Sequence, residues 1–298
     1  MRILPALILI LVFGAGDDEE IVRPLEAKGV KTKKKGGVVV ELHIGPLKGI
    51  TPDDYKAVGQ CRSLVALTLN AEDQKFNDEA AAQLTGLDKL ERFFSNGAQL
   101  SDDGFKALAS WKSLKQIGFD HWFRTQKDKP IGAGLAHLAA LPNLESIRLG
   151  GCMIGMEATE ALATIKTLKK IDVFHTFYVN DDALVPLQKL PDLRIFIAGP
   201  QFQPRITDAA LKTLSGIKSL EEISLTETWL TYEGGFKHLA ALPNLKKLSI
   251  PKVVASEEDV TKLKALLPGL VVEWTSPDEA TTEKTKATFK RFFEKPKK

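Results

Sequence analysis

A short apolar motif, L-x-x-L-x-L, recurs along the chain about every 25 residues. Three apolar positions within six residues suit a short buried strand. A spacing that stays this constant from residue 39 to residue 270 indicates a repeat architecture in which each unit is one supersecondary element. The first positions of the motif, separated by 24 to 30 residues, are Val39, Leu64, Leu90, Leu114, Leu144, Leu168, Leu193, Leu220, Leu245 and Leu270.

The second half of each unit carries the signals of a helix start. An apolar residue precedes a capping residue, then acidic residues, as in Ile50-Thr51-Pro-Asp-Asp and Ile206-Thr207-Asp. Thr, Ser or Asn at this place can accept from the free N–H groups of a first helical turn, and Asp complements the helix dipole. Each repeat is therefore predicted to be a strand, a turn and a short helix. No unit can bury both its faces alone, so the units are expected to stack.

The units resemble leucine-rich repeats. Their length and consensus are similar to the cysteine-containing, F-box-associated type as it occurs in exported bacterial proteins, with Cys152, Thr176 and Thr228 at the place where other types carry Asn. The resemblance implies an α/β right-handed solenoid of about ten repeats, with a parallel sheet on the concave face and short helices on the convex face. The resemblance also implies a general role in binding, but it does not indicate a specific activity. Residues 266–274 look like a terminal repeat in which Trp274 covers the last core layer.

The composition divides the chain into four parts. Residues 1–16 have one Arg, an apolar run and a Gly-Ala-Gly triplet, which predicts a cleaved export signal; an uncleaved signal anchor is the alternative. Residues 17–37 are rich in both charges and predict a linker. The repeat domain spans 38–274. Residues 275–298 form a charged tail for which disorder is expected, with an amphipathic helix on the last repeat or on a membrane as the alternative.

Charge argues against a nucleic-acid ligand. The net charge of the chain is +3, but the repeat body, residues 38–274, holds 27 basic and 29 acidic residues. A protein that binds the phosphate backbone of a nucleic acid usually carries a continuous patch of Lys and Arg side chains. The side chains that point out of the predicted strands have mixed signs, so a protein partner is favoured, with a glycan as the alternative.

Aromatic residues gather in the loops that follow several strands. Counted from the first leucine of each repeat, Phe123, Phe177, Phe202 and Trp229 all occupy position nine. Stacked repeats would place them along one edge, where aromatic and Arg side chains can form interface hot spots; the alternative is that they cap the core. With neighbouring residues and three cations of the concave face, the predicted partner-binding residues are His121, Trp122, Phe123, Arg148, Lys170, Phe174, His175, Phe177, Tyr178, Arg194, Phe202 and Trp229.

No chemistry-bearing motif appears in the sequence. His121 and His175 share position seven in repeats two apart, about 10 Å from each other, which is long for a shared metal ion. Cys61 and Cys152 lie four repeats apart and are predicted to be buried, unpaired thiols. We therefore expect no catalysis, no metal and no cofactor.

These observations predict a non-catalytic, monomeric recognition or adaptor module. It would be exported to the periplasm, envelope or exterior and would bind a protein through its concave face and aromatic edge. Two alternatives stay open: an envelope scaffold or spacer without a specific ligand, and a glycan-binding module.

Overall fold

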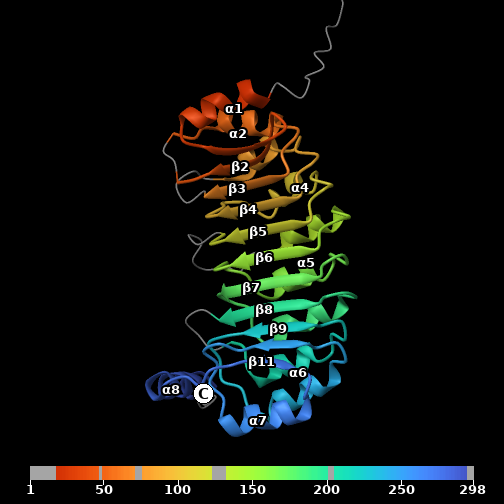
Figure 1. Ribbon diagram of the computed structural model, residues 1–298, viewed down its shortest axis with the longest axis vertical. Coiled ribbons are helices and arrows are strands. Elements are labelled where there is room, and N and C mark those ends of the chain that lie inside the picture. The colour runs from red at the N-terminus through yellow and green to blue at the C-terminus, as the bar shows by residue number, and fades with distance from the viewer. Residues whose placement is uncertain (1–17, 47–48, 71–75, 123–131, 201–204, 294–298) are drawn as a thin grey trace, which may run out of the picture.

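The computed structural model shows one long stack of strands with helices behind it (Figure 1). It describes residues 18–46, 49–70, 76–122, 132–200 and 205–293. The predicted export signal lies outside the described residues.

A single open sheet of eleven strands runs the length of the molecule, and its spatial order follows the sequence order from β1 to β11. Every neighbouring pair from β2 to β11 is parallel, whereas β1 pairs with β2 antiparallel. The strands are β1 (Lys31–Lys35), β2 (Val38–Ile44), β3 (Ala66–Asn70), β4 (Arg92–Asn96), β5 (Gln116–Asp120), β6 (Ser146–Gly150), β7 (Lys170–Thr176), β8 (Ile195–Pro200), β9 (Glu222–Leu225), β10 (Lys247–Ser249) and β11 (Val271–Glu273).

Short helices cover one face of the sheet (Figure 1). They are α2 (Pro52–Gln60), α3 (Asp78–Gln83), α4 (Phe105–Leu108), α5 (Met156–Leu162), α6 (Asp208–Leu214) and α7 (Glu257–Leu266), with the 3₁₀ helices η1 (Ala133–Ala140), η2 (Asp182–Lys189) and η3 (Phe236–Ala241). The helix α1 (Asp18–Ala27) stands at the N-terminal end of the stack, and α8 (Glu279–Phe293) projects to one side of its C-terminal end (Figure 1). The other face, which carries the alternate residues of each strand, is called the concave face below. None of the described helices is both long and apolar enough to cross a membrane.

The leucines of the repeat motif form the core between sheet and helices. In the second repeat, Leu64, Leu67 and Leu69 are all fully buried, and Leu67 is paired in register with Leu42 and Phe93 of the strands on either side. Each strand therefore adds one layer to a core that grows along the stack. Cys61 and Cys152 are buried and unpaired as predicted, and burial raises the pKa of both thiols to about 12.

The segment predicted to be a linker, residues 17–37, is part of the folded stack from residue 18 onward. Val22 and Leu25 of α1 are 0% and 1% exposed, and β1 adds an eleventh strand to the sheet. The Lys28 ammonium lies 2.7 Å from the Asp54 carboxylate and so connects α1 to α2. The linker prediction is therefore wrong, because Val22, Leu25 and Val30 cover the first core layer while most of the charged side chains of the segment are exposed.

The C-terminal tail is also ordered where the structure describes it. Residues 279–293 form α8, and Phe289 is buried against Trp229, with 6.1 Å between ring centroids. The helix alternative for the tail is thus the one observed. Trp274 packs on the core and donates from its indole Nε1 to the Val253 carbonyl at 3.0 Å.

Aspartates at the helix starts bridge consecutive repeats. The Asp181 carboxylate accepts from the backbone N–H of Thr207 at 2.8 Å and from its hydroxyl at 2.6 Å. Asp208 accepts from the same two groups of Thr231 at 2.8 and 2.7 Å. The Thr-Asp pattern therefore serves stacking as well as helix capping, because each Asp satisfies the start of the next unit.

Replacing Asp181 by Asn is expected to change stability in a pH-dependent way. Burial raises the pKa of the Asp181 carboxyl above its ordinary value of 3.8, although the Thr207 hydrogen bonds oppose the shift. The folded state therefore holds the proton more tightly than the unfolded chain, and the associated stability is lost as pH rises through the raised pKa. The wild-type advantage in unfolding free energy over Asp181→Asn should shrink as pH rises from about 4, measured by urea unfolding.

Asp192→Asn is the matched control for this prediction. The hydrogen bond with Arg194 lowers the pKa of Asp192. Its contribution to stability should therefore be fully present above pH 3.8 and be lost as pH falls through the lowered pKa. Equal trends for the two variants would contradict the assignment of Asp181 as a buried bridge.

Candidate binding surface

The concave face is built from two columns of side chains that run across the strands. One column passes through Arg92, Gln116, Ser146, Lys170 and Ile195, and the other passes through Phe94, Gly118, Arg148, Asp172 and Ile197. Because neighbouring parallel strands are about 4.8 Å apart, each column presents one side chain at that interval. The charge and polarity of this face are therefore determined by the residue that each repeat places in each column.

A ladder of opposite charges lies just before the strands begin. Lys115 pairs with Glu91 at 3.0 Å, and Lys169 pairs with Glu145 at 2.7 Å. Arg194, a predicted binding residue, pairs with Asp192 at 2.9 Å and lies 3.7 Å from Glu221. The positive charge of Arg194 is therefore already balanced by these two carboxylates.

Arg148 is held in place by two carboxylates on the neighbouring strands. Its Nε donates to Asp120 Oδ1 at 2.9 Å, its Nη2 donates to Asp120 Oδ2 at 3.3 Å, and its Nη1 donates to Asp172 Oδ2 at 2.6 Å. Gly150 permits this approach, since a Cβ there would lie 2.3 Å from Asp120 Oδ1. Partial burial opposes the charged form, but the two carboxylates raise the pKa of Arg148.

A hollow of about 490 Å³ opens on the concave face over β2 to β7. Its floor includes Phe94, whose ring leans over Gly118: a Cβ at Gly118 would lie 2.8 Å from the Phe94 ring and 3.6 Å from Arg148 Cβ. Lys170 lines the same hollow, and its side chain makes no ion pair or hydrogen bond with any described residue. The hollow thus combines an aromatic ring, a fixed guanidinium and an unpaired ammonium.

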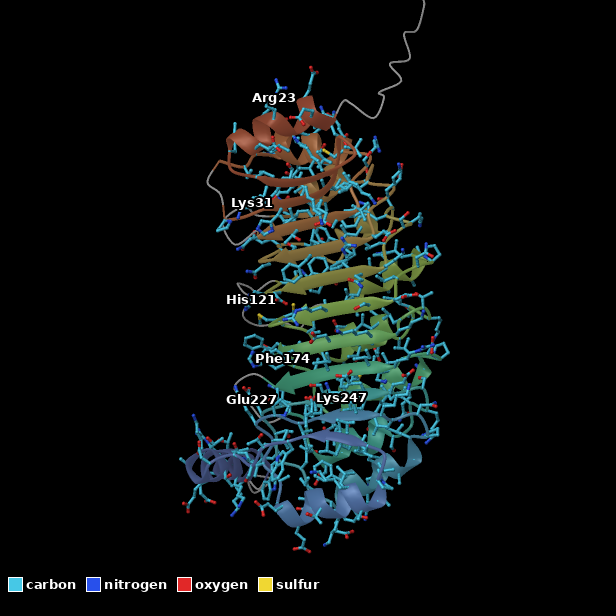
Figure 2. All side chains as sticks on the ribbon, in the orientation of Figure 1. Arg23, Lys31, His121, Phe174, Glu227 and Lys247 are labelled. Carbon is cyan, nitrogen blue, oxygen red and sulfur yellow. The ribbon has the colours of Figure 1, made fainter. Side chains whose placement is uncertain are left out.

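A second aromatic contact lies at the ends of the central strands. Phe174 leans over Gly199, where a Cβ would lie 3.1 Å from the ring, and it stacks on His175 with 3.8 Å between centroids. His175 Nε2 lies 3.5 Å from Glu227 Oε2. Figure 2 shows Phe174 and Glu227 on this edge, together with His121, which directly follows β5.

The two histidines that share position seven occupy a special backbone site. His121 and His175 have positive φ angles of 55° and 57°, as do Glu227 and Lys252 at the same position of later repeats, whereas other repeats use Gly97 or Gly151 there. His121 Nδ1 is 2.8 Å from Asn96 Oδ1. The spacing of the histidines thus reflects a turn at the end of each strand. Within the described ranges, no three His, Cys, Asp or Glu side chains form a group suited to a metal ion.

Among the described residues, the aromatic side chains predicted to bind a partner do not form one exposed surface. Trp122 is 0% exposed, contacts Phe105 and Phe119, and donates from Nε1 to the Leu100 carbonyl at 2.8 Å. Its assignment as a binding residue is wrong, because the widened repeat folds this indole into the core. Trp229 is covered by Phe289 of α8. Phe177 and Tyr178 are half-buried, while Phe123 and Phe202 lie outside the described residues.

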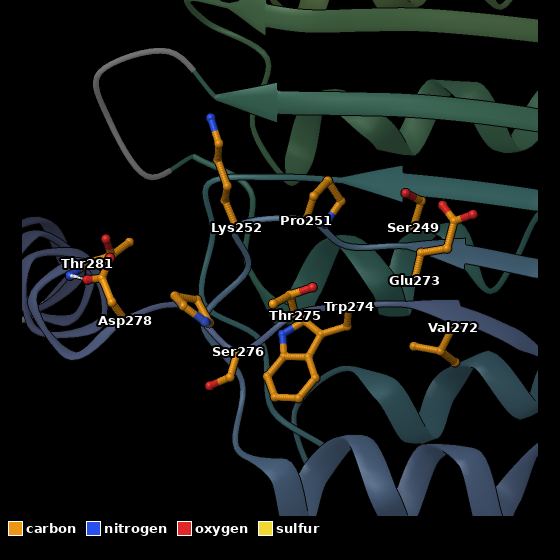
Figure 3. Close-up of a pocket in the computed structure, with 11 residues that line it drawn as sticks. Ser249, Pro251, Lys252, Val272, Glu273, Trp274, Thr275, Ser276, Asp278 and Thr281 are labelled. Carbon is orange, nitrogen blue, oxygen red and sulfur yellow. Dashed lines mark hydrogen bonds between the residues drawn. The ribbon is translucent and has the colours of Figure 1, made fainter.

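A larger hollow of about 1060 Å³ lies at the C-terminal end, between β10, β11 and the segment leading into α8 (Figure 3). Its walls combine Trp274 with Ser249, Glu273 and Asp278. Lys247 pairs with Glu273 at 3.0 Å, Asp278 caps α8 through the Thr281 N–H at 2.6 Å, and the Trp274 indole closes the core. Glu273, Asp278 and Trp274 in this hollow are therefore already bonded to other groups of the protein, whereas Lys170 in the hollow over the central strands is not.

No family model matches the chain, and no curated protein matches it either. Among solved structures, the chain is similar to TLR13 in its complex with ssRNA13, with a TM-score of 0.56 and 18% identity over 79% of this chain. The match covers 32% of that chain, so the present protein spans about a third of its length. Internalin C2 from Listeria monocytogenes gives a TM-score of 0.45 with 19% identity, over 87% of this chain and 92% of that one.

The fold is a leucine-rich-repeat solenoid. Its binding surface, however, could be foreseen only in part. Arg148 and Lys170 were identified by their place between the repeat leucines. Phe94 was missed, although it stands one residue after the core residue Phe93 and must therefore point to the opposite face of β4.

Proposed function

We propose that this leucine-rich-repeat protein is a non-catalytic recognition module that binds a partner protein in the hollow of its concave face. The observation that carries the proposal is the combination of Phe94, the fixed Arg148 and the unpaired Lys170 in one depression. An aromatic ring and a guanidinium are the side chains most often found at interface hot spots. A fixed Arg148 also loses little conformational freedom on binding.

Several features support a role outside the cytoplasm, which we propose as part of this function. The apolar run of residues 3–13 is followed by Gly14-Ala15-Gly16, small residues of the kind that precede the cleavage site of an export signal. The alternative is an uncleaved signal anchor. The repeats are similar to the cysteine-containing type, and we keep that assignment as a proposal. N-terminal sequencing of the natural protein would identify the first mature residue.

Binding is tested by capture from an envelope extract with the wild type and two variants. Lys170→Glu reverses the unpaired charge in the hollow. Lys247→Glu reverses a lysine in the same column of the concave face, three strands away, whose ammonium is paired with Glu273 at 3.0 Å. We expect mass spectrometry to find a protein that is captured by the wild type and Lys247→Glu but depleted about tenfold with Lys170→Glu.

Capture of the same proteins by all three forms would overturn the proposal and favour a scaffold without a specific ligand. The extract should also be treated with ribonuclease in a parallel sample, because the solved chain with a similar fold is a complex with ssRNA13. If capture by the wild type then disappears, the expected exclusion of nucleic acid is wrong for this chain.

A further inference from the structure

We infer that the hollow of the concave face recognises an extended peptide segment that carries a carboxylate and, two residues away, an apolar side chain. This inference rests on the proposed function and names the chemistry of its ligand. The carboxylate would lie between Arg148 and Lys170, and the apolar side chain would lie on Phe94.

Around Arg148 the charges are layered, with anions beneath and cations above, while Glu41 at the other end of the hollow is paired with Arg92 at 3.4 Å and with Lys33 at 3.1 Å. The Asp172 side chain is only 9% exposed and the Asp120 side chain 23% exposed, whereas the Arg148 side chain that joins them is 41% exposed. The two aspartates are occupied by Arg148, and Asp172 also accepts from the Phe174 N–H at 3.1 Å. A ligand therefore meets the cations first, and a carboxylate is the group that they would stabilise.

Arg148 retains hydrogen-bonding capacity toward such a ligand. A guanidinium has five N–H donors. Arg148 uses three of them, one on each nitrogen, in its hydrogen bonds to Asp120 and Asp172, which leaves two N–H groups for a ligand. Lys170 lies diagonal to Arg148 on the next strand, two residues before the register partner Asp172, and is uncompensated among the described residues. One fixed donor and one adjacent ammonium can share the two oxygens of a single carboxylate.

The apolar part of the site is formed by Phe94, which stands in the same column of the sheet as Arg148. The neighbour of Phe94 on β5 is Gly118, which has no side chain, so the Phe94 ring lies over the Gly118 position against the sheet. The stem of Arg148 continues this apolar floor on β6, since Arg148 Cβ lies 3.6 Å from the Gly118 position. The floor can receive one apolar side chain next to the cationic pair.

The spacing of the two subsites sets the ligand pattern. Phe94 and Arg148 stand two strands apart, about 10 Å, and the lean of the ring toward Gly118 shortens the gap. In an extended peptide, residues two apart point to the same side about 7 Å from each other. An acidic residue with an apolar residue two positions away therefore matches the hollow.

The inference is tested by selecting a displayed library of random peptides on the wild type, Lys170→Glu, Phe94→Ala and Lys247→Glu. Wild-type selection should enrich Asp or Glu paired with an apolar residue two positions away. Lys247→Glu should select the same pattern. Lys170→Glu should lose the acidic preference, and Phe94→Ala should keep the acid but lose the apolar preference.

A synthetic peptide from the wild-type selection gives the quantitative test. Changing its acidic residue to the amide, Glu to Gln or Asp to Asn, should weaken binding to the wild type about tenfold to a hundredfold in calorimetry, and much less to Lys170→Glu. The four proteins should unfold at closely similar urea midpoints, which would exclude misfolding as the cause.

The outcomes separate this inference from the proposed function. Selected peptides without acidic enrichment, or with enrichment unchanged in Lys170→Glu, overturn the inference while leaving peptide recognition intact. Failure to select any peptide also overturns it, and the envelope capture then decides the proposed function alone. Enrichment of basic residues by the wild type would show that Asp120 and Asp172 dominate the site.

Discussion

Removing residues 17–37 from a chain that lacks the predicted export signal should unfold the first repeats. Val22 and Leu25 cover the first core layer, and Lys28 binds Asp54 of α2. A repeat array needs a terminal unit with a polar outer face, because an uncovered layer exposes the core. We expect the shortened protein to aggregate or to lose a large part of its urea-unfolding amplitude, measured by circular dichroism.

Deletion of residues 279–298 is the control for the loss of a chain end. Many of the described side chains of α8 are exposed or half-buried, so its loss should lower the melting temperature by only a few degrees. If removal of residues 17–37 had an equally small effect, those residues would be a linker as their composition predicts.

Trp122→Ala should destabilise the protein by about 3–5 kcal/mol. The indole is fully buried, its centroid lies 4.9 Å from that of Phe105, and its N–H satisfies the Leu100 carbonyl. Truncation leaves both a cavity and an unpaired carbonyl. Urea unfolding measures the loss as a lower midpoint.

Two companion variants separate the causes of this loss. Trp122→Phe keeps most of the volume but leaves the Leu100 carbonyl without the indole donor, so it should cost about 1–3 kcal/mol. Trp229→Ala removes a half-buried ring that packs on Phe289 and should cost less than Trp122→Ala. Undiminished stability of Trp122→Ala, with loss of partner capture, would restore Trp122 to the binding surface.

Periodicity predicted the solenoid because the core leucines carry it. Leu64, Leu67 and Leu69 are buried as the motif requires, and the strands pair in the register that the motif sets. The N-terminal unit escaped prediction for a physical reason. Its strand is the lysine-rich β1, and an edge strand needs little apolar content because lysines protect it from further pairing.

The candidate binding surface was harder to predict than the fold, because an aromatic residue in the loop after a strand can turn into the core or pack against another element. Trp122 and Trp229 both follow a strand, yet one enters the core and the other contacts α8. Their fates depend on the length of the loop and on a distant helix, neither of which the local pattern encodes. Phe94, by contrast, could have been assigned from strand alternation alone.

The charge ladder before the strands limits how the array can change in length. Deleting the repeat of Lys115 would bring Glu91 next to Glu145, and deleting the repeat of Glu145 would bring Lys115 next to Lys169. Either change replaces an attractive neighbour pair by a repulsive one, at a cost of up to about 1 kcal/mol for each exposed pair. Loss or duplication of two consecutive repeats in this region would keep the signs alternating. Between Glu91 and Lys169 the array is therefore better suited to changing in steps of two units than in steps of one.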